Sequence, residues 1–207
     1  MKTRQYFNLA FYRYKMVAFS ILLLVCGAMK AENRQHPVSV TIFNQSWAWP
    51  FSELNRFSPL YPGLTVGIYR LQNERMFTFP QSVHMGYFYN NACGSALFLH
   101  GDQSIRFNLK CGFFIEPSLG LGYFHAFHAH DIYKRNSDGR YGKAVDFGKP
   151  SVMFSLSQTI GFDLSKKYGI PIAPFVKIQG IISYPYWEIV LPIRPSNLVH
   201  IGTLIYF

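Results

Sequence analysis

Charge and long apolar runs are both scarce in this sequence of 207 residues. Charged residues make up 14% of the chain, although 49% of its residues are hydrophobic and 18% are aromatic. Only one uninterrupted apolar run is present, near the N-terminus, whereas every spanning helix of a helical membrane protein needs roughly 20 apolar residues. The sequence therefore excludes a membrane protein with several spanning helices. Many aromatic residues at a mean hydropathy near zero are typical of segments with one apolar and one polar face.

Cysteine is also scarce. The chain has three cysteines, and Cys26 lies inside the apolar run, so only Cys93 and Cys111 follow it. If one strand separates these two, they lie at opposite ends of that strand, and at about 3.3 Å per residue they are beyond disulfide reach. We therefore expect no disulfide.

The apolar run, residues 16–29, has the organisation of a secretory signal peptide. Small residues follow it, and four basic residues precede it: Lys2, Arg4, Arg13 and Lys15. We predict a signal peptide over residues 1–28, with cleavage after residue 28 or 31, and a short periplasmic segment over 29–37. The alternatives are a buried helix or a membrane anchor. Val25 stands where a lipoprotein signal has a small residue, which disfavours acylation of Cys26.

Cleavage would leave a moderately basic chain. Removing residues 1–28 lowers Lys+Arg from 20 to 16 against 10 Asp+Glu, so the formal charge falls from +10 to +6. For an exported chain, this excess disfavours nucleic acid as a partner and favours anionic lipid headgroups.

From residue 38 onward the hydrophobic pattern has a period of two residues, which predicts β-strands. Eight strands are expected, near 38–46, 63–72, 76–90, 95–109, 112–128, 151–165, 171–186 and 197–207. A soluble sandwich would alternate as well. Long strands, the export signal and aromatic residues near the strand ends favour a membrane barrel instead. We predict an all-β fold over residues 38–207, a closed antiparallel up-and-down transmembrane β-barrel of about eight strands.

The last predicted strand separates its faces clearly. Its mostly apolar face consists of Val199, Ile201, Thr203, Ile205 and Phe207. The strand near 95–109 separates its faces in the same way, with Leu97, Leu99, Ile105 and Phe107 on one side and His100, Asp102, Ser104 and Arg106 on the other. We expect the apolar faces to contact lipid, and the terminal strand to serve as the membrane-insertion strand.

The predicted connections also differ in length. With the N-terminus on the periplasmic side, the outer loops 47–62, 129–150 and 187–196 are long, and the inner turns 72–75, 110–111 and 166–170 are short. Long outer loops and short inner turns are the pattern of outer-membrane barrels.

The chain resembles the small outer-membrane barrels, such as the OmpA transmembrane domain and OmpX, and especially uncharacterised barrel proteins of the Bacteroidota. The resemblance rests on the terminal strand ending in Phe207 and on the glycine-rich aromatic strands PGLTVGIYR and EPSLGLGYFHAF. It covers nearly the whole mature chain. It implies a membrane-inserted fold and assembly by the barrel assembly machinery, and it implies no activity.

An eight-stranded barrel is just wide enough for its interior to be filled by side chains. Charges buried there need partners. Pairing about the tight turn near 110–112 would place Arg106 opposite Glu116, and pairing about a turn near Ile170 would place Asp163 opposite Lys177. We predict two interior ion pairs. They could form a gate, but compensation of buried charge is the favoured interpretation.

A histidine-rich segment, FHAFHAHD, contains His128 and His130. Two residues apart on a strand, they would share a face, which is the geometry of some divalent-metal sites. His100 and Asp102 on a neighbouring strand could approach from the same wall. The alternative is an ordinary set of interfacial histidines, and we expect no cofactor.

Catalysis by a lipid-modifying enzyme is a further possibility, because such barrels use Ser, His and an acidic residue at the outer rim. The chain has Ser82 with His84, and His100 with Asp102. It lacks the His-x-Ser-Asn segment of outer-membrane deacylases, so no residue is assigned as catalytic. A narrow transporter of small or apolar solutes is the other alternative.

The third outer loop is basic, and Arg and Lys pair well with phosphate. Contacts with lipopolysaccharide would come from Lys134, Arg135, Arg140 and Lys143, and the alternative is a solvated loop with no dedicated ligand. The first outer loop is rich in tryptophan, phenylalanine and proline, so we expect it to be ordered and to pack on the rim. We expect a monomeric outer-membrane barrel with a packed polar interior and a structural or surface-contact role through its outer loops.

Overall fold

The computed structural model describes residues 36–51, 60–71, 76–91, 94–130, 132–135, 139, 141–185 and 193–207. The predicted signal peptide lies outside these residues, as does Cys93, whereas Cys111 is exposed. Within the described part of the chain, no helix is long and apolar enough to cross a membrane.

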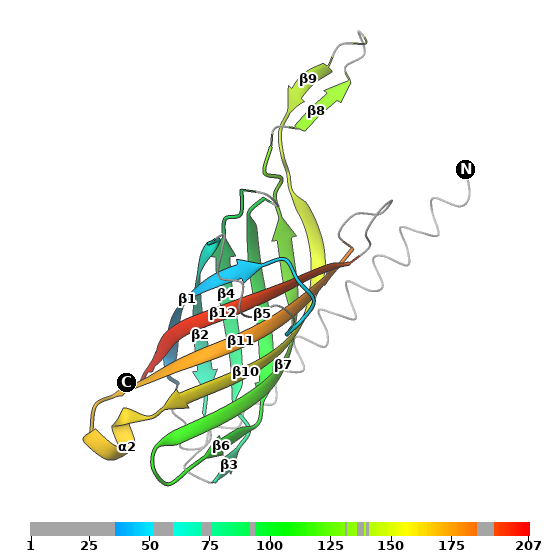
Figure 1. The fold of residues 1–207 in the computed structure, drawn as a ribbon. Coiled ribbons are helices and arrows are strands. Elements are labelled where there is room, and N and C mark those ends of the chain that lie inside the picture. Colours follow the sequence, from blue (N-terminus) through cyan, green and yellow to red (C-terminus); the bar gives the residue numbers. More distant parts are fainter. Residues whose placement is uncertain are drawn as a thin grey trace. The chain divides into compact units, whose positions relative to one another are not determined.

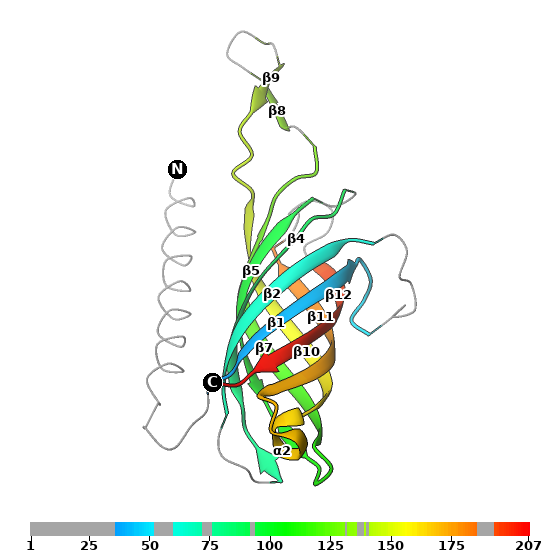
Figure 2. The ribbon, with the colours of Figure 1, turned by 90° about the vertical axis from the view of Figure 1, so that its left-hand side faces the viewer.

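Eight long strands form one closed antiparallel barrel (Figure 1). They are β1 (Val38–Ser46), β2 (Pro62–Arg70), β4 (Gln81–Phe88), β5 (Ala96–Ser104), β7 (Phe113–Ala126), β10 (Lys149–Phe162), β11 (Ile172–Tyr184) and β12 (Arg194–Ile205). Each strand pairs with the next, and β12 pairs with β1 from Val38↔Ile205 to Ser46↔Asn197, so β1 lies between β2 and β12 (Figure 2). The predicted fold class is confirmed.

Smaller elements complete the fold: β3 (Phe77–Thr78), β6 (Arg106–Asn108), the hairpin of β8 (Ile132–Arg135) and β9 (Tyr141–Ala144), and the short helix α2 (Leu164–Tyr168). The strands β3 and β6 are continuations of β4 and β5. Proline explains both interruptions, because Pro80 and Pro117 have no N–H to donate to the neighbouring strand. Ile105, which separates β5 from β6, donates its N–H to the Pro117 carbonyl at 3.0 Å.

The predicted strand positions agree with the structure except at some ends. Strand β12 begins at Arg194 rather than at 197, and β10 ends at Phe162 rather than at 165. After Phe162 the chain enters α2, which begins at the N-cap Asp163 and ends at Gly169, a residue with φ of 68°. The connection between β10 and β11 therefore contains a helical turn rather than the expected short reverse turn.

Two ends of the barrel can be distinguished by their connections. The loop end has the connections 47–61, 89–95, 127–148 and 185–193, and the turn end has 71–80, 109–112 and 163–171. The start of β1 and the end of β12 both lie at the turn end, because Val38 pairs with Ile205.

The outer wall of the barrel is apolar. Outward side chains include Ile42, Phe154 and Ile201, which are 65%, 58% and 62% exposed. The predicted faces are confirmed: in β5, Leu99 is exposed while His100 and Asp102 are buried. In β12, Ile201 is exposed while His200 and Leu204 point inward and are buried, and Phe207, just beyond the strand, is exposed.

The interior contains two apolar clusters with a group of polar side chains between them, and further buried polar side chains, among them Arg106, Glu116 and Arg194, lie beside the clusters. The loop-end cluster contains Phe43, Phe88, Ala96, Phe98, Phe124, Ala126, Met153, Ile181 and Leu198. The turn-end cluster contains Tyr69, Leu71, Phe114, Ala173, Phe175 and Leu204. The group between them, here called the polar layer, contains Thr41, His84, His100, Asp102, Lys177, Gln179 and His200. The interior is therefore filled in layers, and it is less uniformly polar than the alternation predicted.

Candidate functional site in the barrel interior

Asp102 on β5 is the centre of the polar layer. Lys177 on β11 donates a hydrogen bond from Nζ to Asp102 Oδ2 at 3.0 Å. The Nε2 atoms of His100 and His84 lie 3.4 and 3.7 Å from the same oxygen. The Ser155 hydroxyl donates to Asp102 Oδ1 at 3.3 Å. A carboxylate enclosed by a cation and several polar groups satisfies the requirement that a buried charge be paired and hydrogen-bonded.

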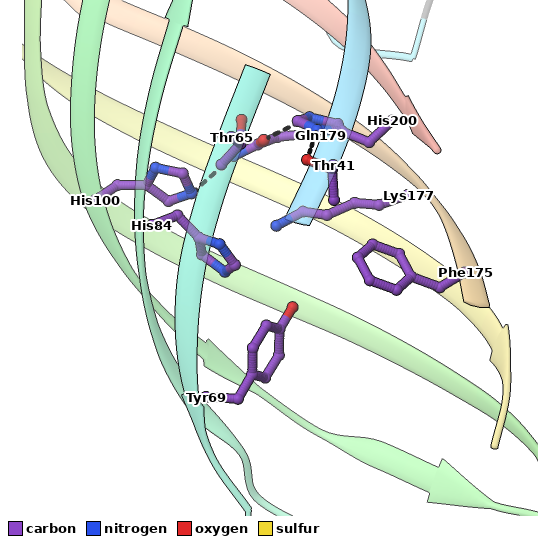
Figure 3. Close-up of a pocket in the computed structure, with 9 residues that line it drawn as sticks. All are labelled: Thr41, Thr65, Tyr69, His84, His100, Phe175, Lys177, Gln179 and His200. Carbon is purple, nitrogen blue, oxygen red and sulfur yellow. Dashed lines mark hydrogen bonds between the residues drawn. The ribbon is translucent and has the colours of Figure 1, made fainter. Parts of the chain in front are cut away.

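A chain of hydrogen bonds extends from this centre to the opposite wall. The Gln179 side-chain amide lies 3.2 Å from His100 Nε2, and its Oε1 accepts a hydrogen bond from His200 Nε2 at 3.1 Å. His200 Nδ1 is 3.3 Å from the Thr41 hydroxyl. Figure 3 shows these side chains converging from β1, β5, β11 and β12. The network therefore connects strands on both sides of the barrel.

Glycine makes room for these side chains. Gly120 on β7 faces Asp102, and a Cβ atom at Gly120 would lie 1.9 Å from Asp102 Oδ1. In the same way, a Cβ atom at Gly67 would lie 2.2 Å from His84 Nδ1. The inward positions of the glycine-rich strands thus leave the space that the large polar side chains of neighbouring strands fill.

A small cavity adjoins the network. Thr65, Tyr69 and Phe175 help to line it, together with members of the polar layer (Figure 3). Its size suits about one water molecule. Such a space is too small for a lipid, a sugar or the path of a hydrated ion.

The donor atoms of His84, His100 and Asp102 lie within 4.8 Å of one another, as three metal ligands would. However, the ammonium group of Lys177 already contacts the Asp102 oxygen that would bind the ion. A cation there would be repelled, and the carboxylate charge is already balanced. We therefore assign no metal to this group.

The shared strand face predicted for a metal site at His128 and His130 is not present in the structure. Among the described residues, the one group of three or more metal-ligand side chains is His84, His100 and Asp102. His128 is exposed and its Nδ1 lies 3.2 Å from Asp146 Oδ1. The two histidines follow the end of β7, where the chain is no longer a strand, so the expected shared face is lost.

A Ser–His–Asp group is present, but without the geometry of a catalytic triad. Ser82 Oγ lies 3.0 Å from His84 Nε2, and Asp102 approaches the same nitrogen. A triad needs the acid and the nucleophile on opposite nitrogens of the imidazole. All three residues are also buried inside the barrel rather than at its rim.

One predicted ion pair is present and the other is wrong. Arg106 donates from Nε to Glu116 Oε2 at 2.5 Å, and its guanidinium lies 4.3 Å from the centre of the Phe114 ring. Lys177 pairs with Asp102 and not with Asp163, which caps α2 through its side chain. The register Thr159↔Lys177 shows the reason. The connection that contains α2 is centred two residues before Ile170, so Lys177 lies opposite Thr159 and not opposite Asp163.

At the loop end, Asp146 holds the two sides of the third loop together. It accepts hydrogen bonds from the backbone N–H groups of His128 and Gly148, at 2.7 and 2.8 Å. Partial burial alone would raise the pKa of the Asp146 carboxyl, but these bonds and the His128 imidazole favour the charged form and lower it.

The residues predicted to contact lipopolysaccharide fall largely outside the described part of the chain. Arg140 is not described, and the side chains of Lys134 and Arg135 are not described either. Lys143 on β9 is exposed. These contacts stay predictions.

The polar layer was only partly anticipated. The sequence indicated that His100 and Asp102 face inward together, but the roles of Gln179, His200 and Thr41 were missed. Their positions carry a weak signal, because each lies on the polar face of an alternating strand. Alternation shows that a side chain faces inward, and it does not show which side chain it meets.

The closed eight-stranded sheet, the apolar outer wall and the filled interior define the class of small transmembrane-type β-barrels. No protein-family model matches the chain, and a search of curated protein sequences finds no match.

The similarity to solved structures agrees with this class. Neisserial surface protein A (NspA) is 10% identical with a TM-score of 0.53, and the match covers 86% of this chain and all of that chain. Ail of Yersinia pestis is 8% identical with a TM-score of 0.49, covering 85% of this chain and all of that one. The N-terminal barrel domain of Pseudomonas aeruginosa OprF is 13% identical with a TM-score of 0.40, covering 84% and 100%. The match to NspA agrees with the small-barrel fold described above.

Proposed function

We propose that this protein is a closed, non-conducting barrel of the outer membrane whose role is structural or is exerted by contacts of its outer loops. The observation that carries the proposal is the filled interior. Two clusters of buried aromatic and aliphatic side chains enclose a polar layer whose one carboxylate is paired with Lys177. Nothing wider than about one water molecule fits in the cavity beside that layer.

The outer wall supports a location in a membrane. Its strands expose large apolar side chains to the surroundings, as a lipid-facing wall requires. Tyr87, Tyr123 and Tyr184 are exposed close to the loop end of their strands, where an aromatic girdle would contact the interface. The predicted signal peptide and insertion strand favour the outer membrane over other membranes, with insertion by the barrel assembly machinery.

The expected partners follow from this location. Outer-membrane lipids would surround the barrel, and the basic third loop would stand among lipopolysaccharide phosphates. We propose further that the protein is a monomer and that nucleic acid is not among its partners. The proposal also includes a relationship to outer-membrane barrel proteins of the Bacteroidota.

The two alternatives receive less support from the geometry. A transporter needs a continuous opening, which the two apolar clusters oppose. A lipid-modifying enzyme needs an accessible nucleophile at the rim, whereas the Ser82 hydroxyl is buried beside His84.

The test is conductance in a planar bilayer. The mature chain is refolded in detergent, inserted into the bilayer, and recorded beside a protein-free membrane and a porin of known conductance. We expect no discrete openings, while protease protection of the same preparation in vesicles shows that it has inserted. Reproducible single-channel steps from inserted protein would overturn the closed-barrel proposal. Failure to insert would overturn its membrane part.

A further inference from the structure

Asn197 breaks the pattern of the outer wall. It lies on the outward face of β12, two residues from Val199 and four from the 62% exposed Ile201, yet it is only 1% exposed. Its partner in the register, Gly180 on β11, also faces outward and is also buried. Something therefore covers the outer wall at this point.

The cover is the start of the first outer loop, residues 47–51, here called the wall segment. The Asn197 side chain accepts a hydrogen bond from the Phe51 N–H at 2.9 Å and donates one to the Trp49 carbonyl at 2.7 Å. Between them, Pro50 packs on Gly180, where a Cβ atom would lie 2.5 Å from the Pro50 Cβ. After β1, the chain thus crosses the outside of β12 and reaches β11 (Figure 1).

These contacts hold the backbone of the wall segment in place. Phe51 has a φ of 62°, a left-handed conformation that costs a non-glycine residue roughly 1–2 kcal/mol. Its N–H is then directed to the Asn197 side chain. Backbone polar groups that face hydrocarbon must be satisfied within the protein. Asn197 satisfies two of these groups, the Phe51 N–H and the Trp49 carbonyl. The wall segment can therefore lie next to lipid.

The aromatic side chains of the wall segment are exposed. Trp47, Trp49 and Phe51 are 47%, 59% and 36% exposed. The segment lies on β11 and β12 toward their loop ends, and Tyr184 at the loop end of β11 is exposed as well. Tryptophan is enriched where one end of its ring contacts hydrocarbon and the other contacts headgroups. The exposed aromatic surface is thus continuous with the apolar outer wall.

We propose that the wall segment is an interfacial anchor that inserts Trp49 and its aromatic neighbours into the boundary between lipid headgroups and acyl chains beside β11 and β12. This inference rests on the proposed membrane location and adds a binding surface on one side of the barrel. Its partner is the lipid bilayer itself. Asn197 holds the segment against the wall.

The experiment uses the emission of Trp49 alone. The chain has three tryptophans, so the double substitution W47F/W187F leaves Trp49 as the only one. This variant is folded into phosphatidylcholine vesicles with bromines either near the headgroup or deep in the acyl chain, and iodide is added to the water. We expect blue-shifted emission, stronger quenching by the shallow bromines than by the deep ones, and weak quenching by iodide.

Asn197→Leu in the same background removes both hydrogen bonds and keeps the branched skeleton of the side chain. We expect the Trp49 emission to shift to the red, bromine quenching to fall and iodide quenching to rise. Gln158→Leu is the matched control, because Gln158 is an amide on the outer wall that donates a hydrogen bond to the neighbouring Thr159 carbonyl. It should leave Trp49 unchanged.

The outcomes separate this inference from the proposed function. If the barrel is protected from protease in vesicles but Trp49 is quenched by iodide and not by bromine, the anchor is wrong while the membrane barrel stands. Quenching by neither reagent, with a crosslinked dimer, would show that a second copy covers the segment and would also overturn the anchor. Failure of the barrel to insert would overturn the proposed function first.

Discussion

Two buried ion pairs among the described residues of the barrel are built differently. Arg106 and Glu116 are 10 residues apart and face each other across the hairpin of β5–β6 and β7, with Arg106 packed on Phe114. Lys177 and Asp102 are 75 residues apart, and β7 and β10 lie between their strands in the sheet. The first pair stabilises one hairpin. The second needs β7 and β10 to pair between the two strands and the sheet to curve, so it couples distant parts of the wall.

The largest expected effect comes from breaking the long-range pair. Lys177→Met leaves Asp102 buried without its cation, which should lower the free energy of unfolding by about 3–5 kcal/mol. Urea titration of tryptophan fluorescence in vesicles measures this. Adding Asp102→Asn should restore part of the loss, because a buried pair replaced as a whole costs less than a broken one. No loss of stability in Lys177→Met would refute the central role of the pair.

Arg106→Met is the matched substitution in the local pair, and the two pairs can be distinguished by the folding and unfolding rates of the two variants. If the hairpin forms before the barrel closes, Arg106→Met slows folding, while Lys177→Met mainly speeds unfolding. Equal partition of both substitutions between the two rates would contradict the distinction drawn between the pairs.

A smaller effect is expected from Gly120→Ala, which disturbs the space around Asp102 without changing charge. The added Cβ atom would meet Asp102 Oδ1 and Ser155 Oγ at 1.9 and 2.3 Å. Overpacking of this kind costs about 1–3 kcal/mol. The control is Gly101→Ala, beside Asp102 on the outer face, where the nearest atom would be the Ser82 carbonyl oxygen at 3.8 Å. Equal urea midpoints for the two variants would mean that the polar layer adjusts freely.

The smallest effect concerns the exposed pair of Asp146 and His128 at the loop end. Because the pKa of the Asp146 carboxyl is lowered by folding, the stabilisation it provides is fully present above its ordinary value of 3.8 and is lost as the pH falls through the lowered value. The amide proton shifts of His128 and Gly148 should titrate with a midpoint below 3.8. Asp146→Asn should abolish that titration and leave global stability nearly unchanged. A midpoint above 3.8 would contradict the assigned hydrogen bonds.

The predictability of the fold follows from local rules. Alternation with a period of two placed Leu99 outward and Asp102 inward, and the same rule gave the outer face of β12. The tight turn near Gly112 set the register of one hairpin, which was enough to pair Arg106 with Glu116. The register predicted from a turn near Ile170 was wrong because α2 occupies that connection. The predicted pairing of Lys177 with Asp163 was therefore wrong as well.

Phe207 and the strand before it illustrate which properties can be predicted from the sequence alone: which segments are strands, which faces are apolar, and that the sheet has an apolar outer wall. These properties depend on neighbours along the chain. Only the tertiary structure decided that Lys177 meets Asp102, that Gln179 joins His100 to His200, and that residues 47–51 cover Asn197. Contacts across a closed barrel depend on the register of every strand at once, and the path of the wall segment depends on a surface that exists only after closure.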